Sequence, residues 1–210
     1  MDLHCEAYLL NDRTLPVEPV VAAFDVVAIG ASAGGVEALH VVINSLPAEF
    51  PSAVVIVQHM DPRHRSHLAE LLGRHSRMPV KQASNGEILL PGTVYLAAPD
   101  SHLLVREGRL LFSDRPHVHF SRPSIDLLFA SVAEAYGVRA TGVVLSGTGM
   151  DGADGVRAIK ARGGTTIVQN PASAAHSGMP HAARATGCAD HVLPLEKIGP
   201  ALVDLAGSAA

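Results

Sequence analysis

The sequence predicts an α/β fold: a doubly wound, mostly parallel sheet with helices on both faces and an inserted antiparallel hairpin. Three observations predict it. Short β-branched runs alternate with helix-patterned segments along most of the chain, as in βαβ units. Some runs, such as 53–57, are apolar throughout, which is typical of interior strands. Between 79 and 113 this alternation of strand and helix patterns is interrupted, and 103–112 resembles two short strands joined by a tight turn.

The elements follow in order along the chain. Their β-branched character predicts strands at 25–30, 53–58, 93–97, 141–145 and 165–168. Apolar spacing at helical period predicts helices at 34–45, 65–75, 123–136, 152–162 and 195–206. Pro47 ends the first helix, and the hairpin is expected to turn at Glu107-Gly108. Residues 1–24 lack clear periodicity and are expected to be an N-terminal tail before one domain over 25–207.

Composition limits the classes of function. The chain has 210 residues, 48% of them hydrophobic, which suffices for a full core. Its 16 basic and 20 acidic residues give a net charge of −4, so nothing favours binding to nucleic acid or an anionic membrane. Cys5 and Cys188 have no metal or redox spacing. Without a signal peptide or an apolar run of roughly 20 residues, we expect a cytoplasmic protein without membrane insertion.

Three of the predicted strands lead into three different reactive side chains, Ser32, His59 and Asp151. In an open parallel sheet, ligands bind in the crevice beyond the carboxyl ends of the strands. A hydroxyl, an imidazole and a carboxylate at that edge are the parts of a hydrolytic triad, which is recognised by role rather than by order in the chain. The pattern therefore indicates an enzyme.

The first glycine-rich turn, Gly30 to Gly35, has several interpretations. It lacks the central glycine of a dinucleotide fingerprint and the lysine of a P-loop, so a nucleotide-binding domain is a weak alternative. As Gly-x-Ser-x-Gly it matches a nucleophile turn that exposes Ser32. The helix that follows offers free N–H groups for a developing oxyanion. Alternatively, Ser32 only caps this helix, and the order Ser, His, Asp differs from that of ordinary α/β-hydrolases.

The other two residues also have alternatives. His59 suits a general base at the sheet edge, but histidines could instead form a metal site, either His59, His64 and His67 or the pair His117 and His119. No matching cysteine or glutamate accompanies them, so neither a metal nor another cofactor is expected.

In the third segment, the glycine-rich run 146–155, Asp151 and Asp154 compete for the role of orienting the imidazole. A simpler role for Asp151 is to cap the helix that opens at Gly152.

The chain resembles the catalytic domain of chemotaxis protein-glutamate methylesterases of the CheB type over about residues 25–205. The similarity rests on the motifs Ile29-Gly-Ala-Ser-Ala-Gly-Gly35, Val57-Gln-His-Met60, Arg122-Pro-Ser-Ile-Asp-Leu-Leu-Phe129, Gly142-Val-Val-Leu-Ser-Gly-Thr-Gly-Met-Asp-Gly-Ala-Asp-Gly155, Gly164-Thr-Thr-Ile-Val-Gln169 and Ala174-Ala-His-Ser-Gly-Met-Pro180. The resemblance implies Ser32 as nucleophile, His59 as base and Asp151 as its orienting carboxylate. It implies a backbone oxyanion donor at Thr148, and we expect the N–H of Ala33, beside the nucleophile, to be another.

The implied reaction is hydrolysis of glutamate γ-methyl esters on chemoreceptor-like proteins, with release of methanol, and in some members deamidation of glutamine. Ala33 replaces a common threonine, Asn170 replaces a usual aspartate, and 60–65 is unusually basic. A receiver domain does not fit in 24 residues, so a stand-alone catalytic domain with a separate receiver or methyltransferase partner is expected. The rival hypothesis is a non-catalytic interaction module of the same fold that pairs with such a partner.

Overall fold

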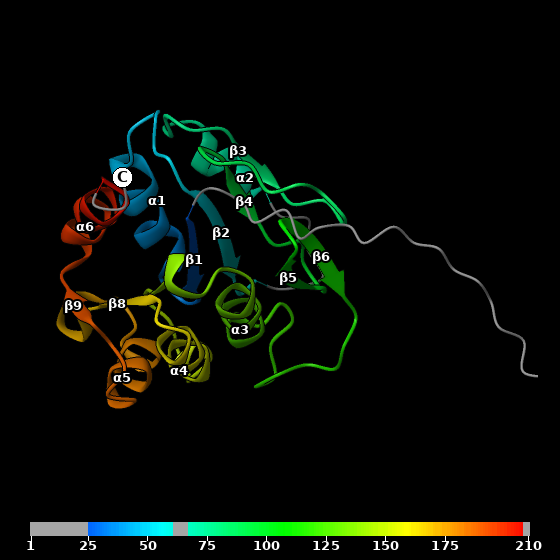
Figure 1. Ribbon diagram of the computed structural model, residues 1–210. Helices are drawn as coiled ribbons and strands as arrows, with labels where there is room; N and C mark the ends of the chain where they lie inside the picture. Colours follow the sequence, from blue (N-terminus) through cyan, green and yellow to red (C-terminus); the bar gives the residue numbers. More distant parts are fainter. Residues whose placement is uncertain (1–24, 61–66, 208–210) are drawn as a thin grey trace, which may run out of the picture.

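A computed structural model describes residues 25–60 and 67–207 (Figure 1). Its centre is a seven-stranded sheet in the order β3-β4-β2-β1-β7-β8-β9, and every neighbouring pair is parallel. The strands are β1 (Val26–Ala31), β2 (Ala53–Gln58), β3 (Val80–Gln82), β4 (Val94–Leu96), β7 (Ala140–Val144), β8 (Thr165–Gln169) and β9 (His191–Leu193). The predicted parallel sheet is confirmed.

Helices cover both faces of this sheet, as predicted. One face carries α1 (Gly35–Ser45), α2 (Leu68–Gly73) and α6 (Leu195–Gly207). The other carries α3 (Ile125–Tyr136), α4 (Ala153–Ala161) and α5 (Gly178–Ala185). Figure 1 shows α1 beside α6 on one side and α3 beside α4 on the other. Each layer buries its own apolar core against the sheet, so the central strands are inaccessible on both faces.

The inserted hairpin is also confirmed. It consists of β5 (His102–Arg106) and β6 (Arg109–Ser113), an antiparallel pair outside the main sheet. Glu107 and Gly108 form the turn with φ values of 50° and 71°, and two positive φ angles are typical of a tight hairpin turn. The hairpin packs on α3, where the Ser131 hydroxyl accepts the Val105 N–H at 3.0 Å.

The order of the strands locates the crevice at the sheet edge. From β1 the chain first builds outward through β2, and later returns to place β7 on the opposite side of β1. The order therefore reverses between β1 and β7, and the carboxyl ends of these two strands border the usual ligand crevice of such sheets. Beyond the ends of β1 and β7 the two segments stay joined, because the Ser32 N–H donates to the carbonyl of Ser146 at 2.9 Å.

Among the strands and α-helices of the described residues, three escaped prediction, namely β3, α5 and β9. Each strand has only three residues, and α5 contains Pro180 and begins at a glycine, so the local patterns are weak. The helix expected at 65–75 is shorter, Leu68–Gly73, and part of its expected start lies outside the described residues, as does the predicted tail 1–24. In the described part of the chain, no helix combines the length and the apolar character needed to cross a bilayer.

Candidate active site

The three predicted triad residues come together at the carboxyl edge of the sheet. Ser32 directly follows β1 and His59 directly follows β2, and the His59 N–H donates to the carbonyl of Ala31 at 3.0 Å. Asp151 lies in the turn between β7 and α4. An ideal Cβ at Gly147 would lie 2.9 Å from Ser32 Cβ, so the glycine lets this turn pack directly on the serine.

His59 and Asp151 form a direct side-chain pair. The distance from His59 Nε2 to Asp151 Oδ2 is 2.9 Å, and the two side chains are 17% and 4% exposed. Because Nε2 is used by the carboxylate, Nδ1 is the ring nitrogen left for proton exchange. Among residues 25–60 and 67–207, no hydrogen bond joins Ser32 Oγ to His59, a contact that often tightens only when substrate binds.

The carboxylate of Asp151 lies at the N-terminus of α3. It accepts hydrogen bonds from the Ser124 hydroxyl at 3.1 Å and from the main-chain N–H groups of Ile125 and Asp126, each at 2.9 Å. Burial raises the pKa of Asp151, but the hydrogen bonds from His59 and from these two amides lower it more, so the pKa is below its usual range. Asp151 therefore stays ionised and can orient an imidazole.

Asp126, near the start of α3, makes the reciprocal contact with the start of α4. Its Oδ1 accepts the N–H groups of Gly152 at 2.9 Å and Gly155 at 2.7 Å, so the second residue of α3 caps α4 while Asp151 caps α3. Burial and the neighbouring Asp151 raise the pKa of Asp126 to about 6 against the opposing amides. The alternative in which Asp151 caps its own following helix is therefore wrong.

The Ser124 side of the site is fixed by a buried histidine. His102 accepts the Ser124 N–H on Nδ1 at 3.1 Å, and its Nε2 faces the carbonyl of Pro116 at 3.1 Å. Nδ1 is thus the acceptor nitrogen and Nε2 the donor, which fixes the neutral tautomer. Sequence reasoning gave no role to His102, Ser124 or Asp126. For the last two, a signal was present in the motif Arg122-Pro-Ser-Ile-Asp126.

Two main-chain amides are candidates for binding an oxyanion, one directly after Ser32 and one directly after Gly147, which packs on the serine. Within the described residues, the main-chain N–H groups of Ala33 and Thr148, the two predicted oxyanion donors, have no hydrogen-bond partner. The Ala33 carbonyl accepts the Ser146 hydroxyl at 2.8 Å, which ties the two turns together. Gly34 is the N-cap of α1 and no side chain caps this helix, so the hypothesis that Ser32 serves as its cap is wrong.

The competing carboxylate Asp154 and the metal-ligand candidates His67 and His119 each pair with another side chain. Asp154 is 68% exposed and pairs with Arg157 at 2.6 Å, whereas Asp151 holds the imidazole. His67 pairs with Glu70 at 3.3 Å, and His64 lies outside the described residues. His119 has potential ligand atoms within 4.8 Å of those of Asp126 and Asp154. Its Nε2 lies 3.5 Å from Oδ2 of the buried Asp126, a distance within the range of an ion pair.

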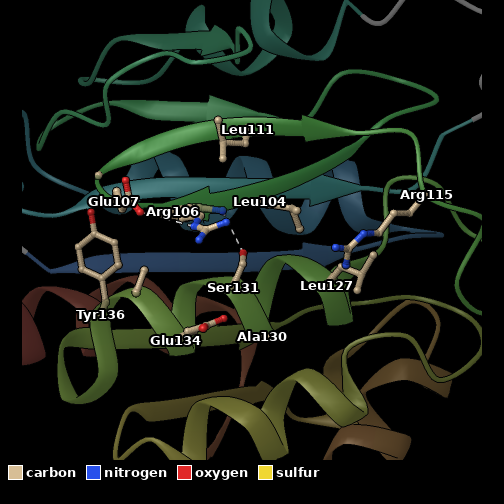
Figure 2. A pocket seen from close by; sticks show the side chains of 13 residues that line it. Leu104, Arg106, Glu107, Leu111, Arg115, Leu127, Ala130, Ser131, Glu134 and Tyr136 are labelled. Carbon is tan, nitrogen blue, oxygen red and sulfur yellow. Dashed lines mark hydrogen bonds and ion pairs between the residues drawn. The ribbon is translucent and has the colours of Figure 1, made fainter. Parts of the chain in front are cut away.

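Two cavities differ in their relation to this site. A cleft of about 510 Å³ opens beside His59 and is lined by apolar Val36 and Leu71 as well as charged Arg74. A larger one, about 630 Å³, lies between the hairpin and α3, where Figure 2 shows hairpin and helix side chains facing the hollow. None of the five predicted site residues lines the larger cavity, so the cleft at His59 is the candidate entrance for substrate.

The chain is similar to known proteins along most of its length. Residues 27–202 match the family model described as CheB methylesterase. A relative from Burkholderia lata, named protein-glutamate methylesterase/protein-glutamine glutaminase 2, is 45% identical over 93% of this chain and 59% of its own length. A relative of the same name from Cupriavidus metallidurans is 44% identical over 96% of this chain and 62% of its own length.

A solved structure agrees in fold. The Thermotoga maritima CheB methylesterase catalytic domain superimposes with a TM-score of 0.84 at 36% identity and covers 87% of this chain and 99% of its own. The chain thus spans 59% and 62% of the lengths of the two curated relatives, and nearly all of the solved catalytic domain. The match of the family model and these identities establish that this chain belongs to the CheB methylesterase family.

Proposed function

We propose that this chain is a serine hydrolase that cleaves γ-methyl esters of glutamate on chemoreceptor-like proteins and releases methanol. The observation that carries the proposal is the hydrogen bond of 2.9 Å between His59 and Asp151, beside the turn that carries Ser32, in a chain of the CheB methylesterase family. The names of the relatives, protein-glutamate methylesterase/protein-glutamine glutaminase, support the substrate class and the reaction.

In the first half of the reaction, Ser32 Oγ attacks the carbonyl carbon of the ester. The hydroxyl proton passes to His59 Nδ1, since Nε2 is engaged by Asp151. The negative charge on the former carbonyl oxygen is met by the free N–H groups of Ala33 and Thr148. When the intermediate collapses, the C–O bond to the methoxy group breaks, and methoxide takes the proton from His59 to leave as methanol.

In the second half, water replaces methanol. His59 removes a proton from a water molecule as it attacks the acyl carbon, and the proton then returns to Ser32 Oγ as the ester bond to the serine breaks. The product is the free glutamate side chain. With a glutamine side chain the same steps release ammonia, which is the glutaminase reaction in the relatives' names. Asp151, with its lowered pKa, stabilises the imidazolium in both halves.

The proposal includes the setting of the enzyme. A methyl-accepting chemoreceptor-like protein is the substrate, the reaction takes place in the cytoplasm, and a separate receiver or methyltransferase protein is the regulatory partner. The rival, a non-catalytic interaction module, needs neither free oxyanion donors nor an ionised carboxylate paired to a histidine. The unpaired N–H groups of Ala33 and Thr148 among the described residues, and the pairing of Asp151 with His59, support the enzyme.

Methanol release from methylated chemoreceptor fragments tests the proposal. We expect release from the wild type and almost none from Ser32→Ala, because the variant lacks the nucleophile. Ser113→Ala on the hairpin is the matched control and is expected to keep full activity. Equal release by Ser32→Ala and wild type would contradict the assignment of the nucleophile. A wild type that releases no methanol and does not react with a serine-directed fluorophosphonate would favour the interaction module.

A further inference from the structure

Gln58 is a buried amide that contacts both catalytic turns. It is the last residue of β2 and only 8% exposed. Its Nε2 donates to the carbonyl oxygen of Ser32 at 2.8 Å and to that of His59 at 2.9 Å. Because both acceptors are carbonyl oxygens, only the NH₂ end of the amide can face them, and both of its N–H groups are used. One side chain therefore links the proposed nucleophile to the proposed base.

The neighbouring turn is shaped to admit this side chain. An ideal Cβ at Gly35 would lie 2.3 Å from Gln58 Oε1 and 2.7 Å from Ala31 Cβ, so any side chain there would push against the amide. Gly35 is the first residue of α1, and its N–H donates to the same Ser32 carbonyl at 2.8 Å. The glycine thus leaves room for the Gln58 side chain. The Gly35 N–H and the Gln58 amide then both donate to the Ser32 carbonyl.

In the part of the chain that the structure describes, few other hydrogen bonds connect the two turns. The ladder between β1 and β2 ends at the pair Ala31 and Gln58, and the His59 N–H bonded to the Ala31 carbonyl is the next link. Past that point the strands have become turns, and the Gln58 amide links the Ser32 and His59 carbonyls directly. The separation of these two main chains determines whether Oγ and an imidazole nitrogen can meet.

Burial of the Gln58 amide oxygen is unfavourable in free energy. Gln58 Oε1 is inaccessible and has no hydrogen-bond partner among the described residues. A buried acceptor without a partner costs about 1–3 kcal/mol, so the amide gains little for stability from its two donated bonds. Buried polar groups of this kind in native structures call for another explanation, and a role at a functional site is a common one.

We propose that Gln58 is a positioning residue that holds the main chains of Ser32 and His59 at the separation needed for proton transfer between Oγ and Nδ1. The inference rests on the proposed function. Gln58 also lines the cleft beside His59, but its NH₂ group is engaged by main-chain carbonyls and its Oε1 is inaccessible, so it offers no free polar side-chain atom to a substrate and is expected to act on the catalytic step. Its loss should lower kcat and leave KM unchanged.

Gln58→Met tests this inference, because methionine keeps the length of the side chain and removes both donors and the orphaned acceptor. We expect kcat for methanol release to fall on the order of 10- to 100-fold, with KM within about twofold of the wild-type value. The rate at which a fluorophosphonate labels Ser32 should fall by the same factor, whereas Tm should shift by only a few degrees. Gln82→Met, the same change on exposed β3, is the matched control and should match the wild type.

A folded Gln58→Met chain with wild-type kcat and labelling rate would overturn the inference alone, and so would a change confined to KM. If Gln58→Met does not fold, Gln58→Asn takes its place: its amide is one methylene shorter and cannot reach both carbonyls, so wild-type kcat in that variant would also overturn the inference. A wild-type chain that neither releases methanol nor takes up label overturns the proposed function, and the positioning role with it.

Discussion

Asp151 and Ser32 lie at the same edge of the sheet but are held in different ways. Hydrogen bonds from Ser124, Ile125, Asp126 and His59 surround the carboxylate of Asp151, which is almost fully buried. Among the described residues, Ser32 is held through its main chain, by the carbonyl of Ser146, the Gly35 N–H and the Gln58 amide, and its hydroxyl has no hydrogen bond to His59. Under the proposed mechanism, the fold preorganises the orienting charge and leaves the proposed nucleophile free to move.

The largest effect should follow from removing the charge on the rigid side. Asp151→Asn keeps the size of the side chain but cannot stabilise the imidazolium, and we expect a loss on the order of 10⁴ in kcat, the size found when the triad aspartate is replaced in the serine-protease template. Steady-state methanol release measures it. Asp154→Asn, an exposed neighbour paired with Arg157, is the control and should stay near wild type. Equal losses in the two variants would show that Asp151 has no special role.

The pH dependence of stability should reveal the raised pKa of Asp126, which caps α4 while Asp151 caps α3. Asp126 has a folded pKa of about 6, above its unfolded value of about 3.9, so the folded state binds its proton more readily. Protonation of Asp126 therefore stabilises the fold as the pH falls from about 7 towards 4, by at most about 3 kcal/mol. This gain should be missing in Asp126→Asn. Urea unfolding at several pH values compares the two, and parallel curves would refute the assignment.

A smaller effect is expected from the hydroxyl that supports the carboxylate. Ser124→Ala removes one hydrogen bond to Asp151 and the N-cap of α3, which should lower kcat about tenfold and stability by about 1 kcal/mol. Ser131→Ala, on the same helix, also breaks contacts of a serine hydroxyl with the main chain but lies away from the triad. It should lower stability while kcat stays unchanged. If both variants lose activity in proportion to stability, Ser124 is only structural.

Much of the fold could be predicted because its strongest elements carry local patterns. The apolar run 53–58 and the helix over 123–136 were placed within two residues of β2 and α3. The short strands β3 and β9 were missed because they owe their conformation to pairing with β4 and β8 rather than to their own residues. The same holds for α5, whose Met179 N–H is fixed by the carbonyl of Gly147.

The site could be predicted only for residues whose own local sequence pattern places them at the sheet edge. Ser32, His59 and Asp151 each follow a strand that the sequence reveals, so their meeting at one edge follows from the topology. Which carboxylate faces the imidazole could not be derived, because Asp151 is held by the start of α3, a segment 25 to 27 positions away in sequence. Gln58 precedes His59 directly, yet its role depends on the Ser32 carbonyl, which only the folded chain brings within reach.

Covalent labelling of Ser32 tests the central claim most directly. The chain is treated with a fluorophosphonate, methanol release is followed as labelling proceeds, and the labelled peptide is identified by mass spectrometry. The account predicts one label per chain, on Ser32, with methanol release lost in proportion to labelling and no reaction in Ser32→Ala. Methanol release that persists in fully labelled protein, or a label on another residue that accompanies the loss of activity, would contradict it.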